Sequence, residues 1–279
     1  MNFSFDWVLV QNELSKSEKV CSYDRPSLAW SDPGPLPQNF AQDAYELHKL
    51  LHNTGVKLPL VLVGHSVGGI IARMYTMQYP NDVAGIVLVD ATSENAILNV
   101  KGKIERVRLL ASSERKIPPI KLKVDSLTKV PDLKDVEALW NMIGKPSISY
   151  PFSLLPSAIQ KTRLWAQSQP KYQIADSYEY MPEEFAQMFS DSLKYRIGSK
   201  PLLILYSSKN EYPKELGTLR DSLMNDKIRN QMNFLKLSSN TKIISTSKSG
   251  HEIFLTEPNL VVNAIKQVII SAKTKSQLK

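Results

Sequence analysis

The stretch that decides the fold reads Leu60-Val61-Leu62-Val63-Gly64-His65-Ser66-Val67-Gly68-Gly69-Ile70-Ile71-Ala72-Arg73-Met74-Tyr75. An unbroken apolar run ends at Val63, a Gly-x-Ser-x-Gly pattern follows, and apolar residues then recur at helical spacing as far as Pro80. This order predicts a buried strand, a tight turn and a helix. A glycine-rich turn with an incidental serine would show the same pattern. The strand before it and the helix after it favour a serine placed for nucleophilic attack.

The predicted turn gives two of its residues a possible role in catalysis. Ser66 lies at its centre, where strained backbone torsions lift the hydroxyl clear of the sheet, and we expect Gly64 and Gly68 to leave the room that such a turn needs. The backbone N–H of Val67 lies at the start of the following helix, whose positive end favours an anion. The sequence therefore predicts Ser66 as a nucleophile and Val67 as an oxyanion-hole donor.

The length, charge and cysteine content of the chain restrict the kinds of fold and function that it can have. A chain of 279 residues, 42% of them hydrophobic, can bury one large α/β domain or a core with an insertion. The net charge of +8 comes from scattered lysines, and no basic run alternates with aromatic residues, so nucleic-acid binding is disfavoured. The single cysteine, Cys21, excludes a disulfide-stapled fold, and we expect it in a buried strand over residues 19–23.

No apolar run has the length of a membrane span, and residues 1–20 lack the layout of a signal peptide. We therefore expect a cytoplasmic protein without stable membrane insertion. The sequence gives no indication of its oligomeric state.

Three further segments predict more strands of the same sheet. They cover residues 83–90, 201–206 and 242–246, and the alternation with helical patterns indicates a mostly parallel sheet flanked by helices. Asp90 ends the first segment, and His251 follows the last one. Because parallel strands gather their carboxyl ends at one edge, we expect Ser66, Asp90 and His251 to meet there. A cap for the next helix at Asp90, or a solvated loop histidine, are the alternatives.

Residues 93–199 change character, because the buried-strand pattern vanishes and lysine and proline become more frequent. Helical patterns recur near 94–111, 133–143, 158–168 and 182–195. We interpret this segment as a helical cap inserted between two parts of the core, residues 1–92 and 200–279. Its aromatic side chains could line an apolar substrate pocket, or only pack the cap's own small core.

His48 and His52 lie four positions apart on a helix predicted over residues 39–53, a spacing that can hold a metal ion. No carboxylate or cysteine pattern completes such a site. We therefore interpret both as surface histidines, and predict neither a metal nor an organic cofactor.

Five motifs together resemble one protein family. In chain order they are Ser-Tyr-Asp-Arg at 22–25, Trp-Ser-Asp-Pro-Gly-Pro at 30–35, Gly-His-Ser-Val-Gly-Gly at 64–69, Leu-Val-Asp-Ala at 88–91 and Ser-Gly-His at 249–251. This combination resembles the lidded serine esterases and lipases of the α/β-hydrolase superfamily. The resemblance covers residues 7–92 and 201–270, and the order of Ser66, Asp90 and His251 matches the superfamily's nucleophile, acid and base.

The resemblance implies an α/β-hydrolase fold and a serine hydrolase that cleaves carboxylic esters through an acyl-enzyme. Ser66 would attack, His251 would carry the proton and Asp90 would orient the imidazole. Many relatives place the acid after the strand at 202–206, where this chain has Asn210 and then Glu211. Glu211 is therefore the reserve acid. The implied substrate is a small-molecule ester with an apolar acyl or alcohol part, and no cofactor is implied.

Such relatives begin with further strands and a glycine-rich loop that supplies a second oxyanion N–H. This sequence opens directly on residues 1–7 and has no glycine before Gly34, so we expect an N-terminally shortened sheet without that loop. A second hypothesis follows, in which the chain is a catalytically impaired or inactive homologue that binds small molecules, or the product of a shortened gene.

Overall fold

The computed structural model describes residues 2–34, 38–100, 102–114, 138, 140–141, 144–169, 171–172 and 182–278. The chain divides into two compact units. The first comprises Met1–Gln38, Pro119–Glu179 and Phe254–Asn259, and the second comprises Asn39–Pro118, Tyr180–Ile253 and Leu260–Lys279. The expected division into core, cap and core at residues 92 and 199 stays a prediction.

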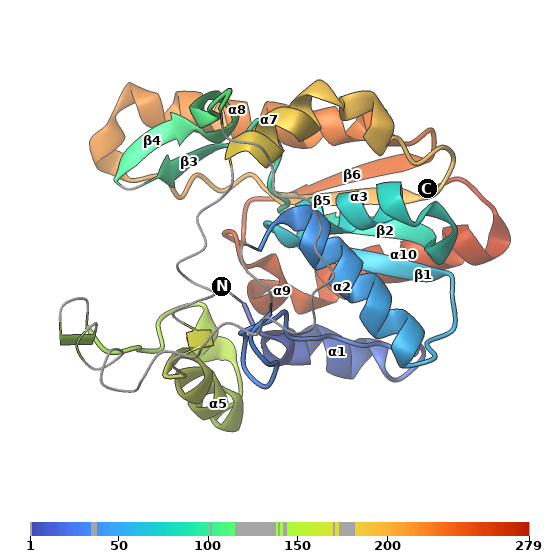
Figure 1. The fold of residues 1–279 in the computed structure, drawn as a ribbon, viewed down its shortest axis with the longest axis horizontal. Coiled ribbons are helices and arrows are strands. Elements are labelled where there is room, and N and C mark those ends of the chain that lie inside the picture. The colour runs from blue at the N-terminus through green and yellow to red at the C-terminus, as the bar shows by residue number, and fades with distance from the viewer. Residues whose placement is uncertain are drawn as a thin grey trace. The chain divides into compact units, whose positions relative to one another are not determined.

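A four-stranded parallel sheet forms the centre of the second unit, with the strand order β1-β2-β5-β6 (Figure 1). Its strands are β1 (Leu60–His65), β2 (Val83–Val89), β5 (Leu202–Ser207) and β6 (Thr241–Thr246). Strands β2 and β5 are buried at nearly every position, as their continuous apolar runs predict, because a strand covered on both faces needs an almost continuous apolar sequence. Strands β1 and β6 also lie where the sequence predicts strands. The predicted fold class, a mostly parallel sheet flanked by helices, is confirmed.

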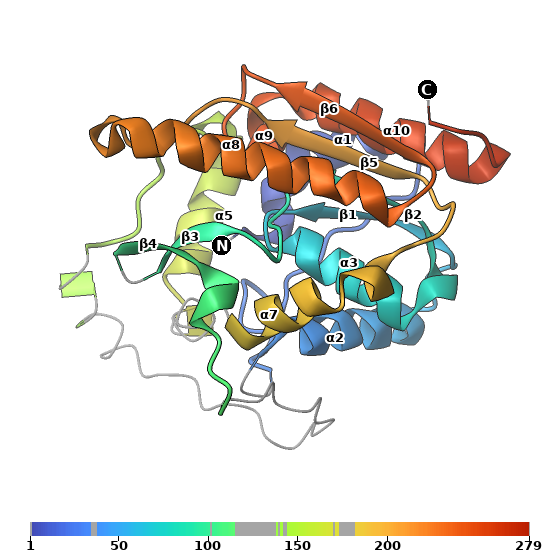
Figure 2. The same ribbon diagram turned by 90° about the horizontal axis from the view of Figure 1, so that it is seen from above.

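Helices cover both faces of this sheet. Four of them are α2 (Phe40–Asn53), α3 (Gly68–Gln78), α8 (Thr218–Asn233) and α10 (Pro258–Thr274). Figure 2 shows α10 on the opposite side of the sheet from α2 and α3. On the α10 side the packing is close, since a Cβ atom at Gly85 of β2 would lie 2.7 Å from Val268 Cγ1. The predicted helix over residues 39–53 is confirmed by α2, after which Gly55 has a φ of +64°.

The segment after β2 is a hairpin and not a helix. Strand β3 (Ile97–Val100) pairs antiparallel with β4 (Lys103–Arg106), and the 3-10 helix η3 (Val107–Leu110) follows. The helix predicted over residues 94–111 is therefore wrong. Gly102 explains the difference, because its φ of +83° allows a turn that an α-helix would not contain.

The first unit is mainly helical in its described residues. It contains η1 (Ser4–Trp7), α1 (Val8–Leu14), η4 (Phe152–Leu154) and α5 (Ser157–Gln167). Its small core consists of buried Phe3, Leu28, Ala29, Ala166 and Tyr172. A buried ion pair joins Arg163 of α5 to Asp6 of η1.

The strand predicted over residues 19–23 is wrong, because this segment has no regular structure and Cys21 is exposed. Side chains rather than a neighbouring strand hold the chain here. Asp24 accepts hydrogen bonds from the backbone N–H of Ser4 at 2.8 Å and from its hydroxyl at 2.9 Å. A short run with few apolar residues has little to gain from burial in a sheet.

Short helices complete the described chain: η2 (Pro80–Asp82), α7 (Pro182–Ser190), η5 (Ser192–Tyr195), η6 (Lys214–Leu216), η7 (Phe234–Leu237) and α9 (Ile253–Thr256). The helices predicted near 158–168 and 182–195 are confirmed by α5 and α7. Most of the one predicted near 133–143 lies outside the described residues. Within the part of the chain that the structure describes, no helix is both long and apolar enough to cross a membrane.

Candidate functional site

Ser66 occupies the tight turn between β1 and α3. Its φ is +54°, a conformation that a non-glycine residue adopts only at a cost of about 1–3 kcal/mol. Hydrogen bonds hold the turn in place: Ser66 N donates to Val89 O at 3.2 Å, and Ser66 O accepts from Gly69 N at 3.0 Å and from Thr92 N at 2.9 Å. The predicted strand, turn and helix are present, with the serine at the strained position.

Glycine is required on one side of Ser66 and not on the other. A Cβ atom at Gly64 would lie 2.5 Å from Gly68 O and 2.8 Å from Gly69 Cα, so only glycine permits this close approach of α3. A Cβ atom at Gly68 would meet no described atom within 4 Å beyond its own helix. The expected steric need for Gly68 is therefore wrong. The second tight position is Gly69, where a Cβ atom would lie 2.4 Å from Ala91 Cβ.

Val67 directly precedes α3 and has helical torsions, with φ −59° and ψ −29°. Its carbonyl accepts from Ile70 N at 2.9 Å and from Ile71 N at 3.2 Å. The first N–H groups of a helix have no acceptor within that helix. The Val67 N–H belongs to this group, and Val67 directly follows Ser66 in the chain. This is the position expected of a backbone oxyanion donor.

Asp90 and His251 are in direct contact. Asp90 Oδ2 lies 2.6 Å from His251 Nδ1, and Asp90 Oδ1 accepts from Ser207 N at 3.0 Å. The Asp90 carboxylate is fully buried, and its φ of +41° is a second strained torsion at this edge of the sheet. The structure thus places the residue after β2 against the imidazole of the loop after β6.

Lys227 of α8 contacts the same carboxylate oxygen, with Nζ 2.8 Å from Asp90 Oδ2. Burial acts to raise the pKa of Asp90, but the hydrogen bond with His251 and the charge of Lys227 outweigh it and hold the pKa below its ordinary value of 3.8. Asp90 is therefore ionised at neutral pH. Sequence reasoning missed Lys227, since a lysine within a helix gives no signal of where its side chain ends.

The Glu211 carboxylate contacts the backbone of His251 rather than its imidazole ring. Its Oε2 accepts from His251 N at 2.9 Å, and its Oε1 is 3.7 Å from Lys209 Nζ. Gly250 makes this position possible, because a Cβ atom there would lie 1.9 Å from Glu211 Oε1. Of the two acids that the sequence offers, Asp90 contacts the imidazole and Glu211 holds the loop.

His65 brings the loop that carries His251 to the turn that carries Ser66. Its Nε2 lies 3.0 Å from His251 O, and the two rings are 4.5 Å apart between centroids. Burial, followed by the charge of His251, lowers the pKa of His65 to about 3, so it is neutral and donates an Nε2–H to that carbonyl. Sequence reasoning also missed this role, although His65 lies within the quoted motif.

A cavity of about 310 Å³ borders Asp90 and His251. Apolar side chains of β3 and α8 form part of its wall, namely Ile97, Leu98, Leu223 and Met224. Lys209, Glu211 and Lys227 add charges of both signs. Ser66 is not among the described residues that line this cavity.

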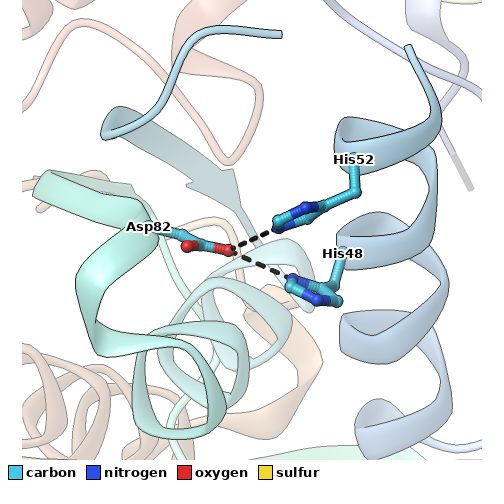
Figure 3. Close-up of side chains that lie close together, drawn as sticks. All are labelled: His48, His52 and Asp82. Atoms are coloured by element: carbon cyan, nitrogen blue, oxygen red, sulfur yellow. Dashed lines mark hydrogen bonds and ion pairs between the residues drawn. The ribbon is translucent and has the colours of Figure 1, made fainter. Parts of the chain in front are cut away.

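The two histidines of α2 have a third neighbour that the sequence did not indicate. Asp82, 34 positions after His48, lies against both rings (Figure 3). The expectation that no carboxylate completes this pair is therefore wrong. Only the packing of α2 beside α3 brings Asp82 there, and no spacing in the sequence encodes that packing.

Comparisons with known proteins agree on the fold. A family model described as the α/β-hydrolase fold matches residues 3–116. An AB hydrolase superfamily protein of Gibberella zeae is 22% identical over 282 residues, covering 94% of this chain and 81% of that protein. The solved structure of a thermophilic esterase from Thermogutta terrifontis has a TM-score of 0.59 at 18% identity, covering 97% of this chain and 86% of that one.

A longer relative matches over a shorter region. An uncharacterized vacuolar membrane protein of Saccharomyces cerevisiae is 31% identical over 105 residues, which cover 37% of this chain and 16% of that protein. This chain thus matches only a small part of that relative. The matching family model, the parallel sheet and the similar solved structures together show that this chain has the α/β-hydrolase fold.

Proposed function

We propose that this chain is a serine hydrolase that cleaves carboxylic esters through an acyl-enzyme on Ser66. The observation that carries the proposal is the 2.6 Å contact between Asp90 and His251, at the edge of the sheet where the Ser66 turn lies. We interpret that turn as a nucleophile elbow, and the three residues as a catalytic triad in the superfamily's order.

In this mechanism Ser66 Oγ attacks the ester carbonyl carbon while His251 Nε2 accepts the hydroxyl proton. The carbonyl oxygen becomes an oxyanion, and the Val67 N–H stabilises it. The carbon–alkoxide bond then breaks, and His251 passes its proton to the departing alcohol. Water attacks the acyl-enzyme in the same way and releases the acid. Asp90 holds Nδ1–H and stabilises the imidazolium in both steps.

The substrate class follows from the same group of residues. The triad needs neither a metal nor an organic cofactor. The esterase among the similar structures supports an ester as the reacting group. We propose an ester with an apolar acyl or alcohol part, a cap formed by residues 93–199, and a cytoplasmic location.

One observation favours a second candidate, an impaired homologue that binds a small molecule without turning it over. Lys227 lies 2.8 Å from the carboxylate that should stabilise the imidazolium, so part of the negative charge of Asp90 is cancelled. A site weakened in this way would retain its cavity and its shape.

Labelling with a fluorophosphonate probe separates the two candidates, because the reagent modifies an activated serine whatever the natural substrate. We expect labelling at Ser66 that is lost in Ser66→Ala and in His251→Ala. The exposed Ser239 provides a matched control, since Ser239→Ala removes a hydroxyl far along the chain and should label as the parent does. Absence of labelling in a folded sample would contradict the hydrolase and favour the binding protein.

A further inference from the structure

His48, His52 and Asp82 form a cluster that the proposed reaction does not use. The two histidines project from consecutive turns of α2, and Asp82 ends η2, the short helix between α3 and β2 (Figure 3). His48 Nδ1 lies 3.1 Å from Asp82 Oδ2, and His52 Nε2 lies 3.5 Å from the same oxygen. One donor atom from each residue lies within 4.8 Å of the other two.

The surrounding side chains hold two of these three groups in place. Tyr75, which is fully buried, donates its hydroxyl to Asp82 Oδ2 at 2.9 Å. The ring of Tyr79 stacks on His48 with centroids 3.7 Å apart and an interplanar angle of 3°. A carboxylate ligand that also accepts a hydrogen bond, and an imidazole with a fixed ring, are typical supports of a metal site. His52 is half exposed, and its ring centroid lies 4.1 Å from that of His48.

The donor set and its spacing indicate the kind of ion. Ligand atoms about 2.0–2.1 Å from Zn²⁺ lie about 3–3.5 Å from one another, and the contacts of His48 and His52 with Asp82 are already in that range. Imidazole nitrogens suit Zn²⁺ and its neighbours in the first transition row, whereas Mg²⁺ and Ca²⁺ prefer oxygen. We propose that His48, His52 and Asp82 bind one Zn²⁺ ion, with water completing the tetrahedron.

The place of the cluster in the fold makes its role structural. Asp82 directly precedes β2, whereas Asp90 directly follows it, so the cluster and the candidate catalytic residues lie at opposite edges of the sheet. The seven residues of β2 span roughly 20 Å. A metal ion there would join α2 to the connection between α3 and β2, and would not reach a substrate at Ser66.

The test is a titration of the whole chain with Zn²⁺ against a chromophoric chelator, together with the visible spectrum of the Co²⁺ form. We expect one equivalent to bind, and we expect His48→Gln, His52→Gln and Asp82→Asn each to weaken binding by more than about tenfold. Lys49→Gln is the matched control, since Lys49 is exposed on the same helix and offers no ligand. His251→Gln tests whether Zn²⁺ binds instead beside the candidate catalytic residues, at the opposite edge of the sheet. This substitution should leave the affinity of the chain for Zn²⁺ unchanged.

Thermal unfolding gives an independent readout. Because an ion that binds only the folded chain stabilises it, Zn²⁺ should raise the Tm of the parent and not that of His52→Gln, while Mg²⁺ should raise neither. Tyr75→Phe should weaken Zn²⁺ binding by about tenfold, through loss of the hydrogen bond to Asp82. Binding that is absent, or that only His251→Gln reduces, would overturn the site. Neither result would bear on labelling of Ser66.

Discussion

Two carboxylates lie near His251, and replacing each by its amide tests which one acts on the imidazole. Asp90→Asn changes the group 2.6 Å from Nδ1. Glu211→Gln changes the group 2.9 Å from the backbone N of the same residue. Both substitutions preserve the size of the side chain, so the comparison isolates charge and hydrogen bonding at the ring from those at the backbone.

The expected losses differ by orders of magnitude. An amide at position 90 offers no charge to the imidazolium, and its N–H group favours the wrong tautomer of the ring, which lowers kcat by about 10⁴-fold in comparable triads. An amide at position 211 still presents an oxygen to His251 N. The change from a charged to a neutral acceptor weakens one hydrogen bond by about 1 kcal/mol, or less than about tenfold in rate.

The assay is hydrolysis of a p-nitrophenyl ester at saturation, with the rate of fluorophosphonate labelling measured in parallel. Thermal unfolding of each variant checks that the fold is retained, since Asp90→Asn also leaves Lys227 without its carboxylate partner. A loss in Glu211→Gln equal to or greater than that in Asp90→Asn would refute the assignment of Asp90 as the acid.

Three further predictions follow from the same geometry. Lys227→Met should speed ester hydrolysis roughly tenfold, because the full charge of Asp90 then stabilises the imidazolium, and should lower the free energy of unfolding by about 1–3 kcal/mol. Burial, partly offset by two backbone N–H donors, raises the pKa of Glu184 from 4.5 to about 8. Between pH 4.5 and about 8 the Glu184 carboxyl is ionised only in the unfolded chain, so the free energy of unfolding should fall as pH rises, by about 1.4 kcal/mol for each pH unit. In denaturant titrations, Glu184→Gln should remove this fall. Gly64→Ala should lower the Tm and abolish labelling, whereas Gly68→Ala should change stability by less than about 1 kcal/mol.

Each of these has a matched control. Lys209→Met removes a lysine that borders the same cavity but pairs with Glu211, and should leave the rate nearly unchanged. Glu215→Gln removes an exposed carboxylate and should leave the pH dependence of stability as it was. A slower Lys227→Met enzyme, a Glu184→Gln variant with the parent's pH dependence, or equal effects at Gly64 and Gly68 would each contradict the reasoning.

The central strands could be predicted because burial on both faces requires a continuous apolar run in the local sequence. Runs such as 83–90 and 201–206 are apolar at nearly every position, and no other element requires that. Residues 19–23 and 94–111 carry weaker patterns, for which strand, helix and loop differ little in sequence. At 94–111 the apolar spacing is compatible with a helix, but Gly102 adopts a positive φ in the turn of a hairpin. An interpretation based on periodicity alone does not take that residue into account.

The candidate site was predictable to the extent that it lies at strand ends. Parallel strands bring their carboxyl ends to one edge, so Ser66 and Asp90 could be placed from the sequence. The contacts of Lys227, His65 and Asp82 could not, because each depends on how a helix or loop packs sideways on the sheet. Such packing arises from many weak apolar contacts spread over several elements.

The strand order explains how two carboxylates come to lie near His251. His251 follows β6, and β5 separates β6 from β2, so an acid after β2 must reach across the end of β5. Asp90 does so by accepting a hydrogen bond from Ser207 N, the last residue of β5, at 3.0 Å, which leaves Oδ2 for the imidazole. Glu211 follows β5 and has the shorter path, but its carboxylate is taken by the backbone of His251. One acid therefore contacts the backbone of the loop, and the other contacts the imidazole ring.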